Sequence, residues 1–123
     1  MSTHKCKPDI SVHFKIWLES GKGEGIMGDG KWTLLKTIQE TGSLRAAALQ
    51  QNISYRKAWG DLKKMEDLLG VALIEKHRGG SERGSTVLTD KGRHWLTAYL
   101  RFKSTLEKTV HSHFSSFLKE LYK

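Results

Sequence analysis

The first regular pattern along the chain is an alternation of apolar and polar positions close to the N-terminus. Apolar residues occupy every second position from Ile10 to Leu18, and most of the residues between them are polar. A period of two is typical of a β-strand with one buried face. The glycine-rich stretch SGKGEG then predicts a reversal, and GIMG predicts a short returning strand. We therefore expect a β-hairpin extension over residues 1–28.

After this hairpin the apolar residues recur at helical spacing. Asp29 is a preferred residue type for the N-cap of a helix through GKWTLLKTIQET, and Gly42 is a preferred type for its end. The apolar side of this first helix comprises Leu34, Leu35 and Ile38. Ser43 follows directly and predicts the cap of a second, short helix, SLRAAALQQ, whose small side chains allow close helix packing.

A tight break at NIS separates this short helix from a third helix, YRKAWGDLKKMEDLLG. Ser54 predicts its cap, and Gly70 predicts its end. One side of the helix is apolar at steps of four, three and four residues, which predicts a buried stripe. The stripe comprises Ala58, Leu62, Met65 and Leu69. Two short helices joined by a few residues form a helix-turn-helix, which can place its second helix in the major groove of DNA.

The remaining sequence predicts a second hairpin and one long helix. Residues 72–74 and 86–88 are short apolar pieces on either side of a Gly/Ser/Arg-rich loop. Thr89 predicts the cap of a helix that continues to Leu121 without a proline, over more than ~45 Å at ~1.5 Å per residue. One side of it carries Tyr99, Phe102, Leu106, Val110, Phe114, Phe117 and Leu121. Because the helix is longer than so small a body can cover, this stripe predicts a dimer interface.

Composition narrows the class of protein. The 123 residues fit one domain, or one domain with an appendage. The net charge of +8 suits a polyanionic partner, either nucleic acid or an anionic membrane surface, although a basic protein without such a partner is the alternative. The single cysteine, Cys6, excludes an internal disulfide. No secretory signal is recognisable and no apolar run reaches the ~20 residues of a membrane span, so we expect a cytoplasmic protein that does not enter a membrane.

The stretch GIMGDGKW contains the G-x-x-x-x-G-K spacing of a phosphate-binding P-loop. That motif requires Ser or Thr after the lysine to bind Mg²⁺, and Trp32 stands there instead. No later strand ending in an acidic residue offers a second metal ligand. We therefore expect no nucleotide site, and we interpret the stretch as a glycine-rich turn between a strand and a helix.

Other patterns for catalysis or metal binding are weak. His4 and Cys6 form one candidate pair of metal ligands, and His111 and His113 form another. Residues two apart on a helix point ~200° away from each other, so the second pair cannot share a metal within one chain. No nucleophile with an oriented base is recognisable. We expect no catalytic residues, no metal and no cofactor, and thus no enzyme.

The third helix predicts a basic face opposite its buried stripe. At ~100° per residue, the side opposite Ala58 carries Arg56, Gly60 and Lys63, with Lys57 and Lys64 beside them. A mid-helix glycine costs ~1 kcal/mol relative to alanine, and one use for it is close approach of the helix to a groove wall. The alternative interpretation is an ordinary solvated face.

The loop KHRGGSERGS predicts a wing that contacts phosphates or the minor groove. Its cations are Lys76, Arg78 and Arg83, and its glycines allow it to follow a nucleic-acid backbone. The alternative is a mobile surface loop.

Over residues 30–96 the sequence resembles the DNA-binding domain of the LysR type, and most closely the N-terminal domain of the molybdate-responsive ModE regulators. The LysR-like elements are Gly42-Ser43-Leu44, Ala47-Ala48, Ile53-Ser54, Met65-Glu66, Leu73-Ile74 and Leu88-Thr89 with Gly92. The ModE-like elements are Ser54-Tyr55-Arg56-Lys57-Ala58-Trp59 and Gly79-Gly80 before Leu88-Thr89. The resemblance implies a winged helix-turn-helix dimer that binds operator DNA.

We therefore expect a mainly α fold with small β-hairpins (α+β). It would comprise the N-terminal hairpin, a winged helix-turn-helix over residues 29–92 and a long C-terminal dimerisation helix over residues 89–123. The recognition helix would span residues 54–69 and the wing residues 76–85. The expected DNA-binding residues are Ser43, Ser54, Tyr55, Arg56, Lys57, Gly60, Lys63, Lys64, Arg78 and Arg83. Tyr55 and Arg56 would read base edges, and Trp59 would serve mainly for packing.

The sequence departs from these families in two ways. Gln51 stands where the families usually have an apolar residue, so the second helix is expected to end early or shift, and Leu49 to compensate. The families also carry C-terminal effector domains, whereas this sequence ends at Lys123, so we expect no molybdate-binding domain in this chain. The alternatives to an operator-binding regulator are a non-specific DNA binder and a winged-helix protein-interaction module.

Overall fold

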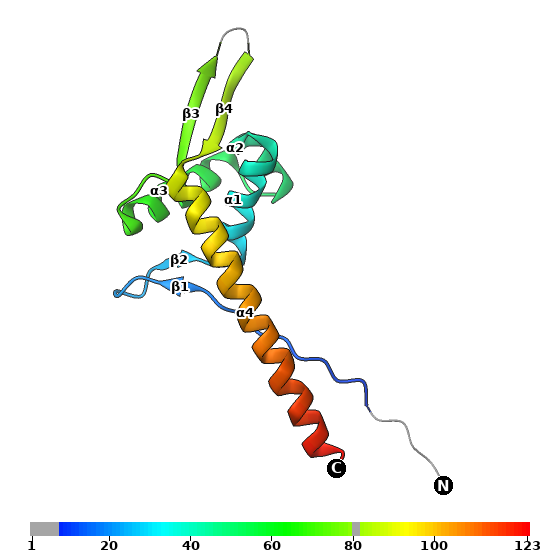
Figure 1. The fold of residues 1–123 in the computed structure, drawn as a ribbon. Coiled ribbons are helices and arrows are strands. Elements are labelled where there is room, and N and C mark those ends of the chain that lie inside the picture. The colour runs from blue at the N-terminus through cyan, green and yellow to red at the C-terminus, as the bar shows by residue number, and fades with distance from the viewer. Residues whose placement is uncertain (1–7, 80–81) are drawn as a thin grey trace.

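The computed structural model describes residues 8–79 and 82–123, and its helices gather at one end of a long C-terminal helix (Figure 1). The elements in chain order are β1 (Leu18–Glu19), β2 (Gly25–Met27), α1 (Asp29–Thr41), α2 (Leu44–Gln50), α3 (Tyr55–Leu69), β3 (Ile74–Gly79), β4 (Glu82–Leu88) and α4 (Asp90–Leu121). Each pair of strands forms an antiparallel two-stranded sheet. The expected α+β class and winged helix-turn-helix are confirmed.

The core lies where α1, α2 and α3 meet, and the base of the β3–β4 wing and the first turns of α4 close it. Its buried residues are Met27, Leu34, Leu35, Ile38, Leu44, Ala47, Ala48, Ala58, Leu62, Met65, Leu73, Leu88, Leu96 and Tyr99. The predicted stripes of the first and third helices are buried, apart from Leu69, which is partly buried. Ala47 and Ala48 supply the small side chains that let α2 pack closely against its neighbours.

Hydroxyl caps and left-handed glycines set the boundaries of the helices. Ser43 Oγ accepts a hydrogen bond from the backbone N–H of Ala46 at 3.0 Å, and Ser54 Oγ accepts one from Lys57 at 3.0 Å. Gly42 and Gly70 end α1 and α3 with φ near +71°, a conformation that other residues rarely adopt. The predicted starts of α2 and α3 and the predicted ends of α1 and α3 are therefore confirmed.

The start of α1 differs from the prediction. Gly28 is its N-cap, without a side-chain hydrogen bond, and Asp29 lies in the first turn. The Asp29 carboxylate instead accepts a hydrogen bond from Lys103 Nζ of α4 at 2.9 Å, and this bond raises the pKa of Lys103. A carboxylate near a helix N-terminus is favourable without capping. Asp29 therefore joins the helix-turn-helix to α4.

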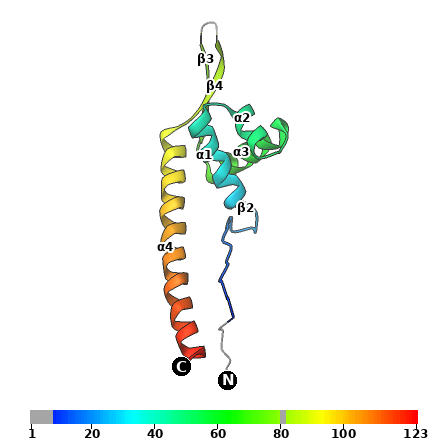
Figure 2. The same cartoon turned by 90° about the vertical axis from the view of Figure 1, so that its right-hand side faces the viewer.

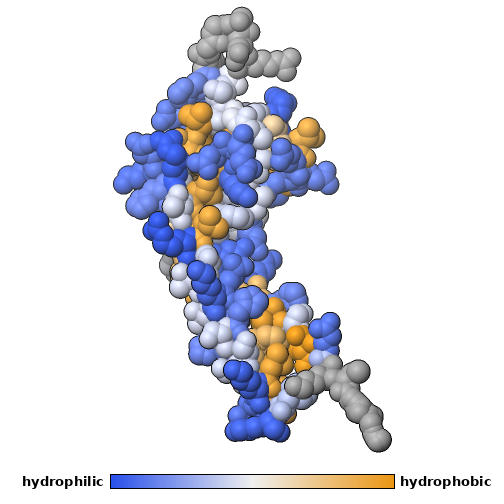
Figure 3. Space-filling model, turned by 45° about the vertical axis from the view of Figure 1, so that its right-hand side comes forward, coloured by the Kyte–Doolittle hydropathy of each residue, from blue (hydrophilic) through white to orange (hydrophobic). Residues whose placement is uncertain are grey.

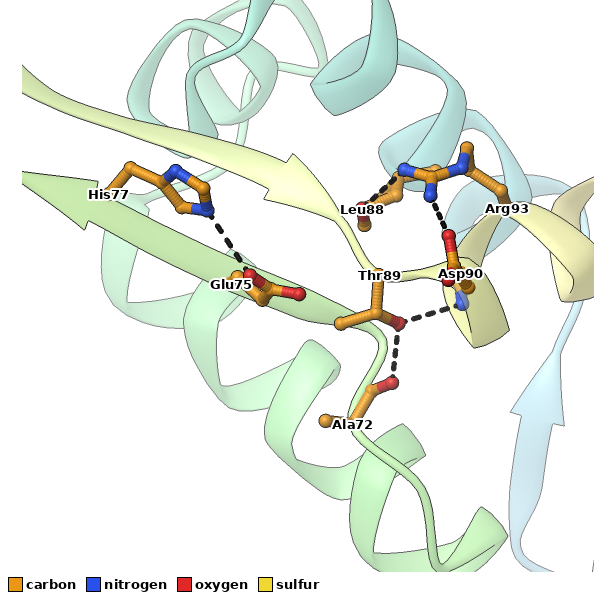
Figure 4. A network of polar contacts seen from close by, with 8 residues as sticks. Ala72, Glu75, His77, Leu88, Thr89, Asp90 and Arg93 are labelled. Atoms are coloured by element: carbon orange, nitrogen blue, oxygen red, sulfur yellow. Dashed lines mark hydrogen bonds and ion pairs between the residues drawn. The ribbon is translucent and has the colours of Figure 1, made fainter.

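The base of the wing is held by hydrogen bonds from both sides (Figure 4). Thr89 Oγ1 caps α4 by accepting from the Gly92 N–H at 2.9 Å, and it donates to the Ala72 carbonyl at 2.7 Å. The Glu66 carboxylate of α3 accepts from the backbone N–H of Leu73 at 2.7 Å and of Ile74 at 3.2 Å. The strands pair over more residues than the apolar pieces predicted, from Ile74 with Leu88 outward to Gly79 with Glu82.

The N-terminal segment forms less sheet than the alternation predicts. Only Leu18 and Glu19 pair with β2, and residues 8–17 are in neither a helix nor a strand. The physical reason is the length of the partner strand, because β2 has only three residues before Gly28 and α1. The expected hairpin therefore exists but is short, and residues 1–7 of the expected extension lie outside the described residues.

The far half of α4 extends beyond the body, and the N-terminal segment runs toward the same end of the molecule (Figures 1 and 2). Ile10 and Leu118 line one shallow pocket there, which places the two segments side by side. Apolar side chains gather near this end of the surface (Figure 3). Phe102, Phe117 and Leu121 are each about half exposed in the single chain.

Tyr99 is an exception to the expected dimer stripe. It is 2% exposed and belongs to the core of its own chain, because α4 still lies against the body at this position. It therefore cannot offer a surface to a partner subunit. The other members of the stripe, Phe102, Leu106, Val110, Phe114, Phe117 and Leu121, are exposed or partly buried.

Candidate nucleic-acid interface

The outward face of α3 is basic and solvent-exposed, as its sequence predicts. Arg56, Gly60 and Lys63 are exposed and lie opposite the buried Ala58. Lys57 and Lys64 are exposed on one flank of the same helix. The structure therefore brings the five α3 positions together on one surface.

The basic residues of α3 differ in their partners. Lys57 pairs with Asp61 at 3.2 Å, Lys63 pairs with Glu66 at 3.4 Å, and Lys64 lies 3.9 Å from Glu24 of the β1–β2 hairpin. Arg56 has no ion pair or hydrogen bond with any described residue. Its five donors are thus available to an external acceptor, whereas a phosphate must compete with a carboxylate for each of the three lysines.

Gly60 packs against no described side chain. A Cβ at this position would meet no heavy atom within 4 Å, so alanine would fit without a clash. Gly92 of α4 is the opposite case, because a Cβ there would overlap the Leu73 carbonyl. The glycine in the middle of the basic face is therefore not explained by the fold of this chain.

Ser43 and Ser54 occupy the N-terminal ends of α2 and α3. Each hydroxyl oxygen accepts a backbone N–H of its own helix. These bonds give both serines a structural role that is independent of any ligand. A hydroxyl still carries one proton to donate, so an additional contact to a phosphate oxygen is compatible with the capping geometry.

Tyr55 lies between cations from two neighbouring elements. Lys76 Nζ of β3 donates a hydrogen bond to the Tyr55 hydroxyl at 2.6 Å. The Arg45 guanidinium of α2 lies over the Tyr55 ring, 4.9 Å from its centroid. The ring itself is partly buried against the core. Arg45 was not among the expected site residues, and only the packing of α2 against α3 brings it to this position.

Two residues have surroundings that differ from the sequence-based interpretation. Trp59 is 42% exposed and lies beside Lys63, whose Nζ is 5.4 Å from the ring centroid, so Trp59 does not serve mainly for core packing. Leu49 is 80% exposed and therefore does not compensate for Gln51. Gln51 follows the last residue of α2, as expected from its polarity, and its amide donates to the Gly30 carbonyl at 3.0 Å.

The wing extends away from the body on the side opposite the free end of α4 (Figure 2). Arg78 lies in β3 and Arg83 in β4, but their side chains lie outside the described residues. Lys76 is exposed on β3, two residues before Arg78 and nearer to the body. The paired strands β3 and β4 thus form the predicted wing. The DNA-binding roles of its two arginines stay predictions.

The P-loop-like stretch lines an open cleft of about 720 Å³ between the β1–β2 hairpin, the start of α1 and α3. Lys31, the lysine of that pattern, donates to the Gly25 carbonyl at 2.9 Å, and burial lowers its pKa.

Across residues 8–79 and 82–123, no three His, Cys, Asp or Glu side chains gather as a metal site would require. The pair His4 and Cys6 lies outside those ranges. None of the described helices is both long enough and apolar enough to span a membrane.

Several known proteins are similar in sequence to this chain. The molybdenum-pterin-binding protein MopB of Rhodobacter capsulatus is 36% identical over 95 residues, which cover 77% of this chain and 34% of MopB. The transcriptional regulator ModE of Haemophilus influenzae is 36% identical over 78 residues, which cover 63% of this chain and 31% of ModE. The chain thus spans about a third of the length of these curated relatives.

A solved structure, that of ArgP from Mycobacterium tuberculosis, aligns with a TM-score of 0.46 at 21% identity, over 66% of this chain and 30% of that chain. The family model for bacterial regulatory helix-turn-helix proteins of the lysR family matches residues 31–93, which run from the first turn of α1 to the first turn of α4. This match covers just over half of the 123 residues and includes α2, α3 and the wing. The chain therefore belongs to the LysR family of bacterial regulatory helix-turn-helix proteins.

Proposed function

We propose that this chain is the DNA-binding part of a transcriptional regulator that binds operator DNA as a homodimer in the cytoplasm. The observation that carries the proposal is the exposed basic face of α3 around Gly60, where no described residue occupies the space that a Cβ would fill. In a helix-turn-helix this face enters the major groove, and a missing side chain allows the helix backbone to approach the groove wall.

The contacts divide into those that read sequence and those that neutralise phosphate. Arg56, at the N-terminal end of α3 and without a partner among the described residues, is the residue we assign to a base edge, where a guanidinium can bind guanine O6 and N7 together. We assign Lys57, Lys63 and Lys64, together with the wing residues Arg78 and Arg83, to phosphates. Their release of counterions makes affinity fall steeply with salt.

The dimer interface is proposed to lie along the far half of α4. Phe117 and Leu121 are exposed there, on a helix that extends beyond the body, and Phe102 is exposed in the first half of the same helix. A soluble helix that leaves such a stripe uncovered usually buries it against another helix. Two copies related by a two-fold axis would present their α3 helices about 34 Å apart, or a multiple of one DNA turn.

Of the two functions that the names of the relatives mention, only one is part of the proposal. ModE of Haemophilus influenzae is named a transcriptional regulator, and MopB is named for binding molybdenum-pterin. The α3 and wing geometry described above supports carrying over the regulatory DNA-binding role. Nothing in the described residues supports carrying over a site for molybdenum.

The proposal is tested by selecting binders from a random duplex library at two salt concentrations. A recovered palindrome with half-sites about one DNA turn apart would support a dimeric, sequence-specific regulator. Enrichment that is uniform across sequences and sensitive to salt would show that the chain is a non-specific DNA binder and not a sequence-specific regulator. The absence of any enrichment at low salt would overturn DNA binding and favour a protein-interaction module.

A further inference from the structure

The ring of Tyr55 connects the helix-turn-helix to the wing. Lys76 reaches it from β3, with Nζ at 2.6 Å from the hydroxyl oxygen and at 5.3 Å from the ring centroid. Arg45 reaches it from α2, with its guanidinium carbon at 4.9 Å from the same centroid. Three elements that are separate in the sequence therefore meet at one aromatic side chain.

Tyr55 is poorly placed to read a base. Its ring is partly buried against the core, on the side of α3 that faces α2 and the wing. Its one polar atom already accepts a short hydrogen bond from Lys76. Arg56, one residue later, is exposed and unpaired among the described residues. The two neighbours therefore have different surroundings, although the sequence analysis expects the same role for both.

The cations around Tyr55 lack a neutralising carboxylate. Arg45 and Lys76 are both exposed, and neither forms an ion pair with a described residue. Two like charges held at one side chain repel each other, and the cation–π attraction of Arg45 is modest at an exposed site. A phosphate group beside them would remove this repulsion and accept hydrogen bonds from both donors.

We propose that Arg45, Tyr55 and Lys76 form a phosphate clamp, in which Tyr55 is a positioning residue and the two cations contact the DNA backbone. This inference rests on the proposed DNA binding. Tyr55 holds Lys76 through its hydroxyl and Arg45 through its ring face, and so fixes the wing strand β3 relative to α2 and α3. The clamp adds affinity for any duplex and sets the register of α3 in the groove, but it reads no base.

The test compares four single variants, Arg45→Gln, Lys76→Gln, Tyr55→Phe and Tyr55→Leu, on one duplex recovered from the library selection and one duplex of unrelated sequence. Arg45→Gln and Lys76→Gln are each expected to weaken binding to both duplexes alike and to reduce the salt slope by about one. Tyr55→Phe keeps the ring but releases Lys76, so it should reproduce part of the Lys76→Gln effect. Tyr55→Leu should approach the effect of both cation variants together.

A matched control is available on α1. Lys36 also lies over an aromatic ring, 5.5 Å from the centroid of Trp32, and it is exposed outside the proposed clamp. Lys36→Gln removes the same charge and is expected to leave the salt slope nearly unchanged. Thermal melting of each variant establishes that it is folded, and Tyr55→Phe preserves the ring if Tyr55→Leu does not fold.

Two further results decide the assignment. In a chain that already carries Arg45→Gln and Lys76→Gln, adding Tyr55→Phe should change affinity no further, because Tyr55 acts through these cations. If Tyr55→Phe instead altered the selected operator sequence while the salt slope stayed constant, Tyr55 would be a base reader and the clamp would be wrong. If the unmodified chain bound no duplex at all, the proposed function itself would fail, and the two failures are thereby distinguished.

Discussion

Two glycines in helices show how a residue's surroundings separate a structural role from a functional one. Gly92 is required by packing, because any Cβ there would overlap the Leu73 carbonyl, whereas Gly60 faces open space. Both residues lie in helices, where glycine is the least favourable residue apart from proline. The fold explains the first glycine, and close approach to DNA is the explanation that we propose for the second.

Gly60→Ala is expected to increase the free energy of unfolding by about 1 kcal/mol, since alanine is the better helix former, and to weaken DNA binding. Urea denaturation and a duplex-binding titration on the same preparation measure the two effects. Gly92→Ala is the contrasting variant, with an expected loss of stability from the steric overlap. A Gly60→Ala protein that gained stability and kept its affinity would contradict close approach of α3 to the groove.

Arg56→Gln is expected to relax sequence preference, at a cost of about 1–3 kcal/mol on the preferred operator and little on unrelated duplexes. The reason is that Arg56 forms no hydrogen bond or ion pair with the part of the chain that the structure describes. Lys57→Gln, one residue further along, removes the same charge from a side chain that already pairs with Asp61. Selection experiments on both variants separate a base contact from a loss of charge, and equal effects would argue against base reading by Arg56.

Tyr99→Phe is expected to stabilise the chain by about 1 kcal/mol at neutral pH, because the buried hydroxyl has no hydrogen-bond partner among the described residues. Burial, with a smaller contribution from Asp29, raises the pKa of the Tyr99 phenol above its ordinary 10.0. The folded chain thus retains this proton when the unfolded chain has lost it. The stability of the unmodified chain should therefore fall as the pH rises above 10, relative to the variant.

Urea denaturation at pH 7 and pH 11 measures this difference. The stability advantage of Tyr99→Phe should be larger at pH 11 than at pH 7. A constant or shrinking difference would show that the phenol is not held in its neutral form by the core.

At the scale of the elements, the boundaries that depend on one local residue were predictable. Ser43, Ser54 and Thr89 cap their helices, and Gly42 and Gly70 end theirs, as their residue types indicate. These features depend on backbone groups no more than a few positions away. Local sequence is therefore sufficient to predict them.

The failures concern contacts between elements. The strand expected near Ile10 lacks a partner of sufficient length, which an alternating pattern does not reveal. Asp29 pairs with Lys103, a residue 74 positions away, instead of capping α1. Arg45 was missed as a site residue because only the crossing of α2 and α3 brings it to Tyr55. Such contacts depend on tertiary packing, for which one sequence gives no direct signal.

At the scale of the whole molecule, α4 has two uses along its length. Its first turns complete the core through Leu96 and Tyr99, and its far half carries the exposed apolar stripe. The predicted stripe ran through both parts, because one helical period serves an internal core and an external interface equally well. The position at which the body ends could not be predicted from that period.

Phe117→Glu is expected to shift the chain from dimer to monomer, because it places a charge in the proposed interface at a side chain that is 51% exposed in the single chain. Sedimentation velocity over a range of concentrations measures the change. Ser116→Glu introduces the same charge at the neighbouring exposed position and should leave the dimer intact. A Phe117→Glu protein that still sedimented as a dimer would place the interface elsewhere.

The Thr89 cap joins the last strand of the wing to α4 without a linker, and the Lys103–Asp29 pair attaches the body to the side of the same helix. A long helix attached at two points has a fixed orientation relative to the body. If two such helices meet at their far ends, the rotation of one DNA-binding body relative to the other is fixed before any DNA is present. The protein would then discriminate operators by the helical phase of their half-sites as well as by their bases, and adding one base pair between half-sites would cost binding even when every contacted base was retained.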